Sequence, residues 1–282
     1  MRDVMRDVMR NVTRDMMRPA MRLERRSQPW LGTLVEISAR HVGVACAHRA
    51  IDAGFAAISH VHRAMSPQIA GSDVDRINRA AVGEAVDVCE STWQVLCLAD
   101  DLHRRSGGLF DCAVDTHRSR SSQRDLDLSR ERIVIKRGPL AIDLGGIAKG
   151  YAVDAAIDAL GEAGAASACV NAGGDIAVFG DQTFRVDVRD PFEPRVRHRL
   201  VELRDFAFAT SSIEESNALL SGPHARDIDR NAFDRGASVC VLAPRCMLAD
   251  ALTKVVALSG ATSHALVASC GASAIVLPSR HG

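Results

Sequence analysis

The residues best suited to chemistry lie in two glycine-rich turns between residues 141 and 180. The first turn, DLGG at residues 143–146, is expected to leave a strand and enter a helix through backbone that glycine adopts freely. The start of a helix offers free N–H groups to an anion. Lys149 falls in the first turn of this helix, where a cation opposes the helix dipole. The segment therefore predicts a phosphate site, although it contains neither GxxxxGK nor GxGxxG.

The second turn, NAGGD at residues 171–175, is expected to join two strands and to let a neighbouring segment come close. A β-hairpin alone would explain a single glycine pair. Two glycine pairs in one short stretch, accompanied by Asp143, Lys149, Asn171 and Asp175, favour a shared site.

A third candidate segment contains Asp250, Thr253 and Lys254, which share one face of an expected helix. A carboxylate and a hydroxyl one turn apart offer the hard oxygen ligands that Mg²⁺ prefers. A surface ion pair between Asp250 and Lys254 is the alternative interpretation. Of the 35 basic residues only three are lysines, and two of these lie in the candidate segments. A compact ammonium differs from the planar arginine fork, so this bias favours a tight site in both places.

Composition excludes several classes of protein. The chain has 282 residues, 47% hydrophobic and 25% charged, which is typical of a folded globular protein. Its net charge of zero and its few aromatic residues argue against nucleic-acid binding. No apolar run approaches the roughly 20 residues that a membrane span needs. The eight cysteines show neither CxxC nor zinc spacing, and we expect a cytoplasmic protein with reduced thiols.

Hydrophobic periodicity predicts helices alternating with strands that also come in hairpin runs, which is typical of an α+β fold with mixed or antiparallel sheets. Residues 1–28 repeat an arginine every four positions and are expected to form a flexible basic arm, followed by one domain at 29–282. We expect a polar loop at 115–131 and an irregular stretch at 212–235. The predicted helices are 44–65, 73–80, 91–105, 147–163, 247–258 and 262–269; the predicted strands are 31–38, 168–171, 176–179, 184–188, 199–203, 206–210, 237–242 and 274–277, with a hairpin formed by 132–136 and 140–143.

Three of these segments resemble the motifs of a known family. The run DLGGIAKGYAVD at 143–154 and the run VNAGGDI at 170–176 are similar to the central motifs of the ApbE family of FAD:protein FMN transferases, and ADAL at 249–252 is similar to its C-terminal metal motif. The resemblance implies an α+β fold that binds FAD as substrate and Mg²⁺. It also implies cleavage of the FAD pyrophosphate, attachment of FMN to a Thr or Ser of an acceptor protein, and release of AMP.

Position within these motifs implies the roles of single residues. Lys254 stands where the family usually has a threonine, and residues 221–236 depart from the family pattern. A flavin-binding protein without transferase activity and an enzyme that hydrolyses FAD to FMN and AMP therefore stay open as alternatives. The implied FAD contacts are Leu109, Phe110, Asp111, Asp143, Lys149 and, at an aromatic position of the family, Gln68; the implied metal ligands are the carbonyl of Gly146, Asp250 and Thr253; the implied catalytic residues are Lys149 and His224.

Overall fold

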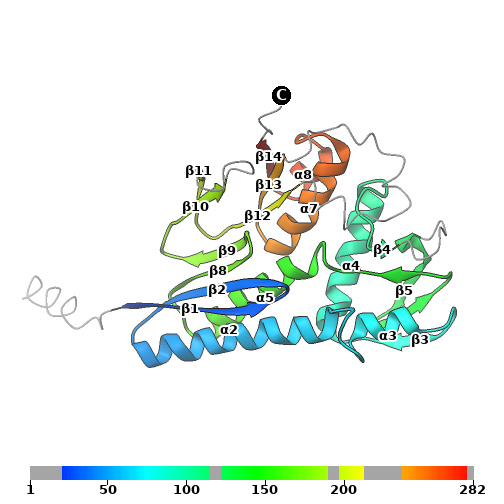
Figure 1. Ribbon diagram of the computed structural model, residues 1–282, viewed down its shortest axis with the longest axis horizontal. Coiled ribbons are helices and arrows are strands. Elements are labelled where there is room, and N and C mark those ends of the chain that lie inside the picture. Colours follow the sequence, from blue (N-terminus) through cyan, green and yellow to red (C-terminus); the bar gives the residue numbers. More distant parts are fainter. Residues whose placement is uncertain (1–20, 115–121, 190–196, 213–236, 278–282) are drawn as a thin grey trace, which may run out of the picture.

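A seven-stranded antiparallel sheet forms the centre of the computed structural model, which describes residues 21–114, 122–189, 197–212 and 237–277 (Figure 1). Its strand order is β1-β2-β8-β9-β12-β13-β14, and every neighbouring pair runs antiparallel. The strands are β1 (Arg22–Trp30), β2 (Thr33–His41), β8 (Ser167–Ala172), β9 (Asp175–Gly180), β12 (Ala207–Ser212), β13 (Ser238–Ala243) and β14 (Ser273–Leu277).

The two faces of this sheet are covered differently. Helices α2 (Val44–Met65), α5 (Ala148–Glu162) and α7 (Cys246–Ser259) pack on one face. The hairpin of β10 (Phe184–Arg189) and β11 (Arg197–Leu203) contributes to a second apolar cluster. Successive residues of β9 point to opposite faces of the sheet: Ala177 belongs to the core under the helices, and Val178 belongs to the second cluster. The period of two along a strand thus gives the sheet two buried faces.

A smaller group of elements lies beyond the C-terminal end of α2 (Figure 1). It contains helices α3 (Asp73–Arg79) and α4 (Glu90–Arg105), a sheet of order β3-β6-β5, and the short pair β4–β7. Both groups share one hydrophobic core. The α+β class with antiparallel sheets is therefore confirmed. The remaining elements are β3 (Ala85–Asp87), β4 (Ala113–Val114), η1 (Gln123–Asp125), β5 (Leu126–Arg130), β6 (Ile133–Lys136), β7 (Ala141–Ile142) and α8 (Ala265–Ser269).

Three local expectations are wrong in the described residues. The arm predicted at 1–28 does not extend over Arg22–Trp30, which pairs along its whole length with β2; residues 1–20 lie outside the described ranges. The loop predicted at 115–131 contains η1 and β5 from residue 123 onward. Strand β7 pairs with β4 rather than forming a hairpin with β6. Of these elements, only β7 pairs with a strand distant in sequence; β1 pairs with the next strand across a two-residue turn, and β5 pairs with β6, which follows it directly.

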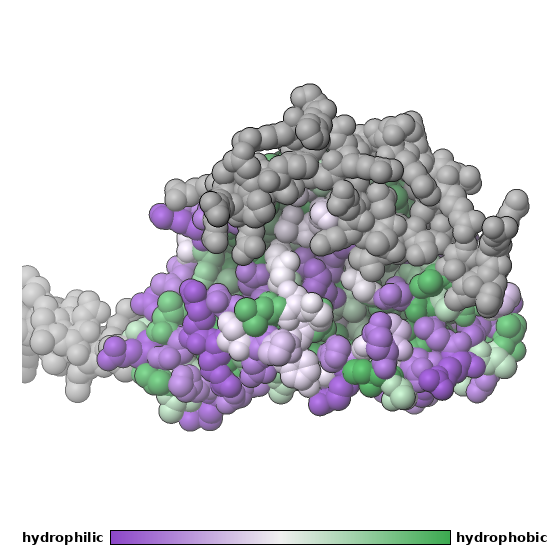
Figure 2. All heavy atoms as spheres, in the orientation of Figure 1, coloured by the Kyte–Doolittle hydropathy of each residue, from purple (hydrophilic) through white to green (hydrophobic). Residues whose placement is uncertain are grey.

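The surface carries both hydrophobic and hydrophilic side chains, as expected for a folded globular protein (Figure 2). Hydrophobic side chains on the face shown in Figure 2 lie in small groups among hydrophilic ones. Within the described ranges, no helix combines the length and apolarity needed to cross a membrane.

Candidate functional site

The turn that precedes α5 is held by side chains on both sides. The amide of Asn78 on α3 acts like a strand partner of Ile142: its Oδ1 accepts from the backbone N–H at 2.8 Å and its Nδ2 donates to the carbonyl at 3.0 Å. Immediately afterwards, Oδ1 of Asp143 accepts a hydrogen bond from the N–H of Gly145 at 2.8 Å. Neither Gly145 nor Gly146 has a positive φ. The prediction that this turn needs a backbone conformation that glycine adopts freely is therefore wrong.

The second glycine turn does require glycine. Gly173 and Gly174 form the hairpin between β8 and β9 with φ values of 63° and 105°. A Cβ on Gly173 would lie 2.6 Å from Oγ1 of Thr33, at the start of β2. The close approach predicted from the sequence is therefore present, and it fixes the turn between β1 and β2 beside the hairpin.

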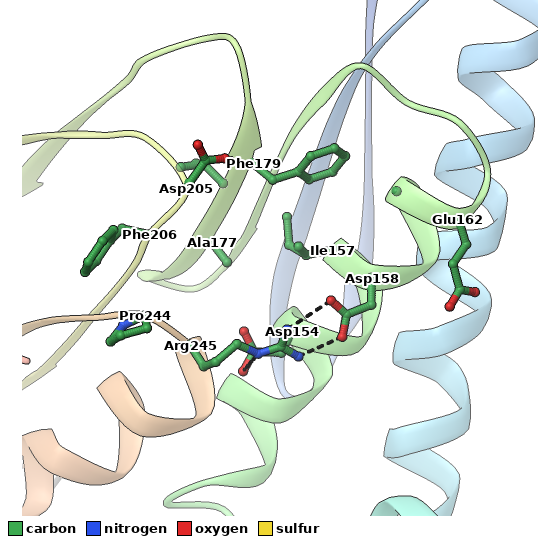
Figure 3. Close-up of a pocket in the computed structure, with 12 residues that line it drawn as sticks. Asp154, Ile157, Asp158, Glu162, Ala177, Phe179, Asp205, Phe206, Pro244 and Arg245 are labelled. Atoms are coloured by element: carbon green, nitrogen blue, oxygen red, sulfur yellow. Dashed lines mark hydrogen bonds and ion pairs between the residues drawn. The ribbon is translucent and has the colours of Figure 1, made fainter. Parts of the chain in front are cut away.

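Helices α5 and α7 are joined through their buried polar groups. The carboxylate of Asp154 on α5 accepts hydrogen bonds from the N–H groups of Cys246 and Met247, at 2.8 and 2.9 Å, and so caps the start of α7. Arg245 forms a bidentate pair with Asp158 at 3.0 and 2.7 Å (Figure 3). These contacts set the position of the α7 residues predicted to bind metal.

Two cavities have residues of α5 in their lining. The larger, about 510 Å³, is bordered by the Arg245–Asp158 pair, by Phe179 and by Phe206 (Figure 3), and contains none of the predicted site residues. The smaller, about 300 Å³, is lined by Gln68, Asp143 and Lys149. We take the smaller cavity as the candidate site, because Asp143 and Lys149, selected on chemical grounds, and Gln68, implied by the family resemblance, all line it.

Three segments build the walls of the candidate site. Leu31 and Gly32 come from the turn between β1 and β2, and residues 61–68 come from the end of α2 and the loop after it. The third wall is the glycine turn and the first turn of α5, including Lys149. The Trp30 ring meets the His62 ring edge-on, with centroids 5.8 Å apart, and so fixes the apolar side of the cavity.

Lys149 is paired with a buried carboxylate beneath the cavity. Its Nζ lies 2.8 Å from Oδ2 of Asp175, the first residue of β9, and its side chain remains 25% exposed whereas that of Asp175 is 1% exposed. Within the described residues, neither oxygen of Asp175 has a well-aligned hydrogen bond. The contact between Lys149 and Asp175 is therefore an ion pair. The pair leaves part of the ammonium open to the cavity, where it can bind a phosphate.

The surroundings of this pair shift both pKa values upward. Burial, aided by the charge of Asp250, raises the pKa of Asp175 to about 7, although Lys149 and Lys254 act in the opposite direction. Burial alone would lower the pKa of Lys149, but the charges of Asp175 and Asp250 outweigh it, and the pKa is raised. Lys149 therefore keeps its positive charge across the physiological range.

The raised pKa of Asp175 predicts a pH-dependent contribution to stability. An unfolded chain releases this proton near its usual pKa of 3.8, whereas the native protein holds it up to about 7. Between these values the native state binds more protons, so the free energy of unfolding falls as pH rises. Asp175→Asn removes this titration. In urea titrations we expect the free energy of unfolding of the wild type, relative to the variant, to decrease from about pH 4 to 7 and then level off. Parallel profiles would show that Asp175 does not hold the proton.

The predicted metal ligands do come together on α7. Oδ2 of Asp250 accepts from the N–H of Gly150 at 3.1 Å, and Oγ1 of Thr253 donates to the carbonyl of Asp250 at 2.6 Å. Lys254 contacts Oδ1 of the same carboxylate and lies against the position of Gly146, at 3.6 Å from a Cβ built there. The Asp250 carboxylate that a metal would use is thus already bound by Lys254, and Oγ1 of Thr253 is hydrogen-bonded to Ser211 and to the Asp250 carbonyl, so this arrangement does not fit Mg²⁺.

The other predicted residues fall into three groups. The Phe110 ring lies next to Gly146, and Leu109 packs against the core. Asp111 is turned away from the cavity: Oδ1 accepts from the N–H groups of Ala113 and Gln123 at 2.8 and 3.0 Å, and Oδ2 accepts from the Ser122 hydroxyl at 2.8 Å. His224 lies outside the described residues. A contact of Asp111 with FAD remains a prediction that these hydrogen bonds do not favour.

Sequence reasoning includes Asp175 among the polar residues of a shared site but does not predict its ion pair with Lys149, although a charged side chain at the start of an otherwise apolar strand, DIAVFG, is a signal for a buried pair. It assigns no site role to Asp154 and Asn78, which also hold the site together. Asp154 lies in the DLGGIAKGYAVD motif and caps α7. Nothing in the sequence distinguishes Asn78 as a site residue beyond its position on a short helix.

Comparison with known proteins shows which family the chain belongs to. The sequence model of the ApbE family matches residues 31–276, which is most of the chain. This chain belongs to the ApbE family. A curated relative, the FAD:protein FMN transferase of Rhodobacter capsulatus, is 31% identical over 191 residues, covering 57% of this chain. The chain spans 36% of the length of that ApbE relative.

Solved ApbE structures share the fold. A variant of the flavin transferase ApbE from Vibrio cholerae superposes with a TM-score of 0.76 at 22% identity, covering 93% of this chain and 95% of that one. The apo flavinyl transferase ApbE of Pseudomonas stutzeri gives 0.75 at 20% identity, covering 93% and 92%. At this identity the likeness establishes the ApbE fold, and the DLGG turn, the NAGGD turn and α7 occupy one region of it.

Proposed function

We propose that this chain is an FAD:protein FMN transferase. The observation that carries the proposal is the cavity in which Gln68, Asp143 and the partly exposed ammonium of Lys149 converge beside the start of α5. A diphosphate bound there would meet the positive charge of Lys149 and the positive end of the α5 helix dipole. Membership in the ApbE family and the name of the curated relative support the same activity.

The proposed reaction transfers FMN from FAD to a protein. The hydroxyl oxygen of a Thr or Ser on the acceptor forms a bond to the FMN phosphorus. The bond from that phosphorus to the bridging oxygen breaks, AMP leaves, and the hydroxyl proton passes to a base. Lys149 would stabilise the charge on the phosphates, and in such phosphoryl transfers positioning and electrostatics supply most of the acceleration. His224 stays a predicted catalytic residue, on the strength of the resemblance alone.

Two further predictions from the sequence, Mg²⁺ binding and a cytoplasmic location, differ in how well they are supported. The residues at Asp250 do not fit Mg²⁺ as they stand, so no step of the proposed reaction passes through a metal ion. A cytoplasmic location is supported by eight cysteines that all carry free thiols, which suits a reducing compartment.

The test of the proposal follows both products. Purified protein is incubated with FAD, with and without an unmodified acceptor that carries a known covalent FMN site on threonine, and AMP and acceptor mass are measured. We expect AMP together with an acceptor mass gain of one FMN residue. AMP without acceptor modification, repeated with several acceptors, would show an FAD hydrolase instead. Tight FAD binding with no AMP would show a flavin-binding protein without transferase activity.

A further inference from the structure

The ammonium of Lys254 is enclosed by oxygen atoms. Its side chain is 5% exposed. Nζ donates to the carbonyl of Asp250 and to Oγ of Ser211, both at 3.2 Å, and to the carboxylate Oδ1 of Asp250. An ammonium has three N–H donors, so all of its hydrogen-bonding capacity is used by these three oxygens. The Lys254 side chain is therefore held inside the site and does not extend to solvent.

The same oxygens are the type that a divalent cation needs. A carboxylate, a carbonyl and a hydroxyl form a hard donor set. The remaining hydroxyl, Oγ1 of Thr253, is engaged with Ser211 at 3.0 Å and with the carbonyl of Asp250. Within the described ranges, no group of three or more His, Cys, Asp or Glu side chains is arranged to hold a metal. A metal ion would have to displace a tethered cation from these oxygens.

Charge balance supports the same conclusion. The cluster contains two buried carboxylates, Asp175 and Asp250, and the ammonium groups of Lys149, whose side chain is 25% exposed, and of buried Lys254. Its net charge is zero when all four groups are ionised and positive when Asp175 holds a proton. In either state a divalent ion would add unbalanced positive charge in a largely buried place, which is costly. Removal of Lys254 lowers the charge of the cluster by one, which favours a cation.

We propose that the ammonium of Lys254 takes the place of a divalent cation in this site, so that the protein neither needs nor binds Mg²⁺ there. The inference rests on the proposed function only for its consequence, which is AMP release from FAD in the presence of EDTA. The occupied cation position itself is a property of the apo protein. Metal binding therefore tests it separately from activity.

The experiment compares the binding of Mn²⁺, a spectroscopic probe for Mg²⁺, in four variants and the wild type. Free Mn²⁺ is measured by electron paramagnetic resonance, and the melting temperature is measured with Mn²⁺ and with EDTA. We expect no saturable binding and no shift in melting temperature for the wild type. Lys254→Thr should gain saturable Mn²⁺ binding and a higher melting temperature with Mn²⁺. Lys254→Met, which vacates the position without adding a hydroxyl, should gain weaker binding.

Lys136 provides the matched control. It is also a buried lysine, and its Nζ donates to a carbonyl oxygen, that of Asn78, at 3.0 Å. Lys136→Met should lose stability without gaining a response to Mn²⁺. Saturable Mn²⁺ binding by the wild type at this site, abolished by Asp250→Asn, would overturn the inference. So would Lys254 variants that fold but bind no Mn²⁺, because the oxygens would then not form a cation position. If the wild type releases no AMP under any condition, the proposed function fails while the binding data still decide the inference.

Discussion

Lys149→Met is expected to lower the rate of AMP release from FAD by about 10²–10³-fold, the usual loss when one fixed electrostatic contact to a transition state is removed. Lys149 brings its charge to the cavity from the first turn of α5, and Asp175 holds its Nζ at 2.8 Å from below. Methionine has a similar length but no charge. The measurement is single-turnover AMP release at saturating FAD, alongside FAD affinity.

The fold should survive this substitution. Asp175 would lose its ion partner, but a buried carboxyl whose pKa already lies at about 7 can take up a proton instead of remaining charged. Circular dichroism and a urea titration check this point.

Arg185 offers a charge-matched control. It lies on β10, is largely exposed, and pairs with Glu202 in the β10–β11 hairpin, whose apolar residues belong to the second cluster. Arg185→Met removes the same charge from the protein and should leave AMP release within about twofold of the wild type, as is usual for surface positions. If Lys149→Met retains activity comparable to that control, the cavity at Lys149 is not the reacting site.

Gly150→Ala is expected to destabilise the protein by about 3 kcal/mol or more, at the upper end of overpacking effects. A Cβ at this position would overlap the backbone carbonyl of Cys246 and lie 2.9 Å from Cβ of Asp250. A carbonyl at the start of a helix cannot rotate away as a side chain can. The free energy of unfolding from urea titration measures the effect.

Gly161→Ala in the same helix is the control. A Cβ there meets only the Phe179 ring, at 3.9 Å, which is ordinary contact. Because alanine favours a helix over glycine, this variant should be neutral or more stable by up to about 1 kcal/mol. If Gly150→Ala were as stable as Gly161→Ala, α5 and α7 could move apart without cost, and the close helix contact would not position Asp250.

Local sequence patterns are sufficient for most of the elements. The apolar spacing of residues 44–65 corresponds to α2 as observed, and Ser72 caps α3 by accepting from the N–H of Asp75. The strands on both sides of the NAGGD turn also agree with the prediction. These features depend on neighbours within a few residues, so one sequence contains the information. Strand β7 pairs with β4, which is distant in sequence, and its partner is predicted wrongly. Strand β1 pairs with the next strand, β2, but its sequence RLERRSQPW is mostly polar and lacks the apolar alternation that indicates a strand.

By itself, the sequence determined the α+β class, the two glycine turns and the choice of Lys149, Asp250 and Thr253, because residue type and spacing along one helix face are local properties. Only the tertiary structure decided which groups meet. It placed Asp175 beneath Lys149, since β9 begins where α5 crosses it. It also enclosed Lys254 with Asp250 and with Ser211, which comes from β12, 43 positions away. The charge state and ligands of a buried group depend on such distant neighbours, and no spacing along the chain specifies them.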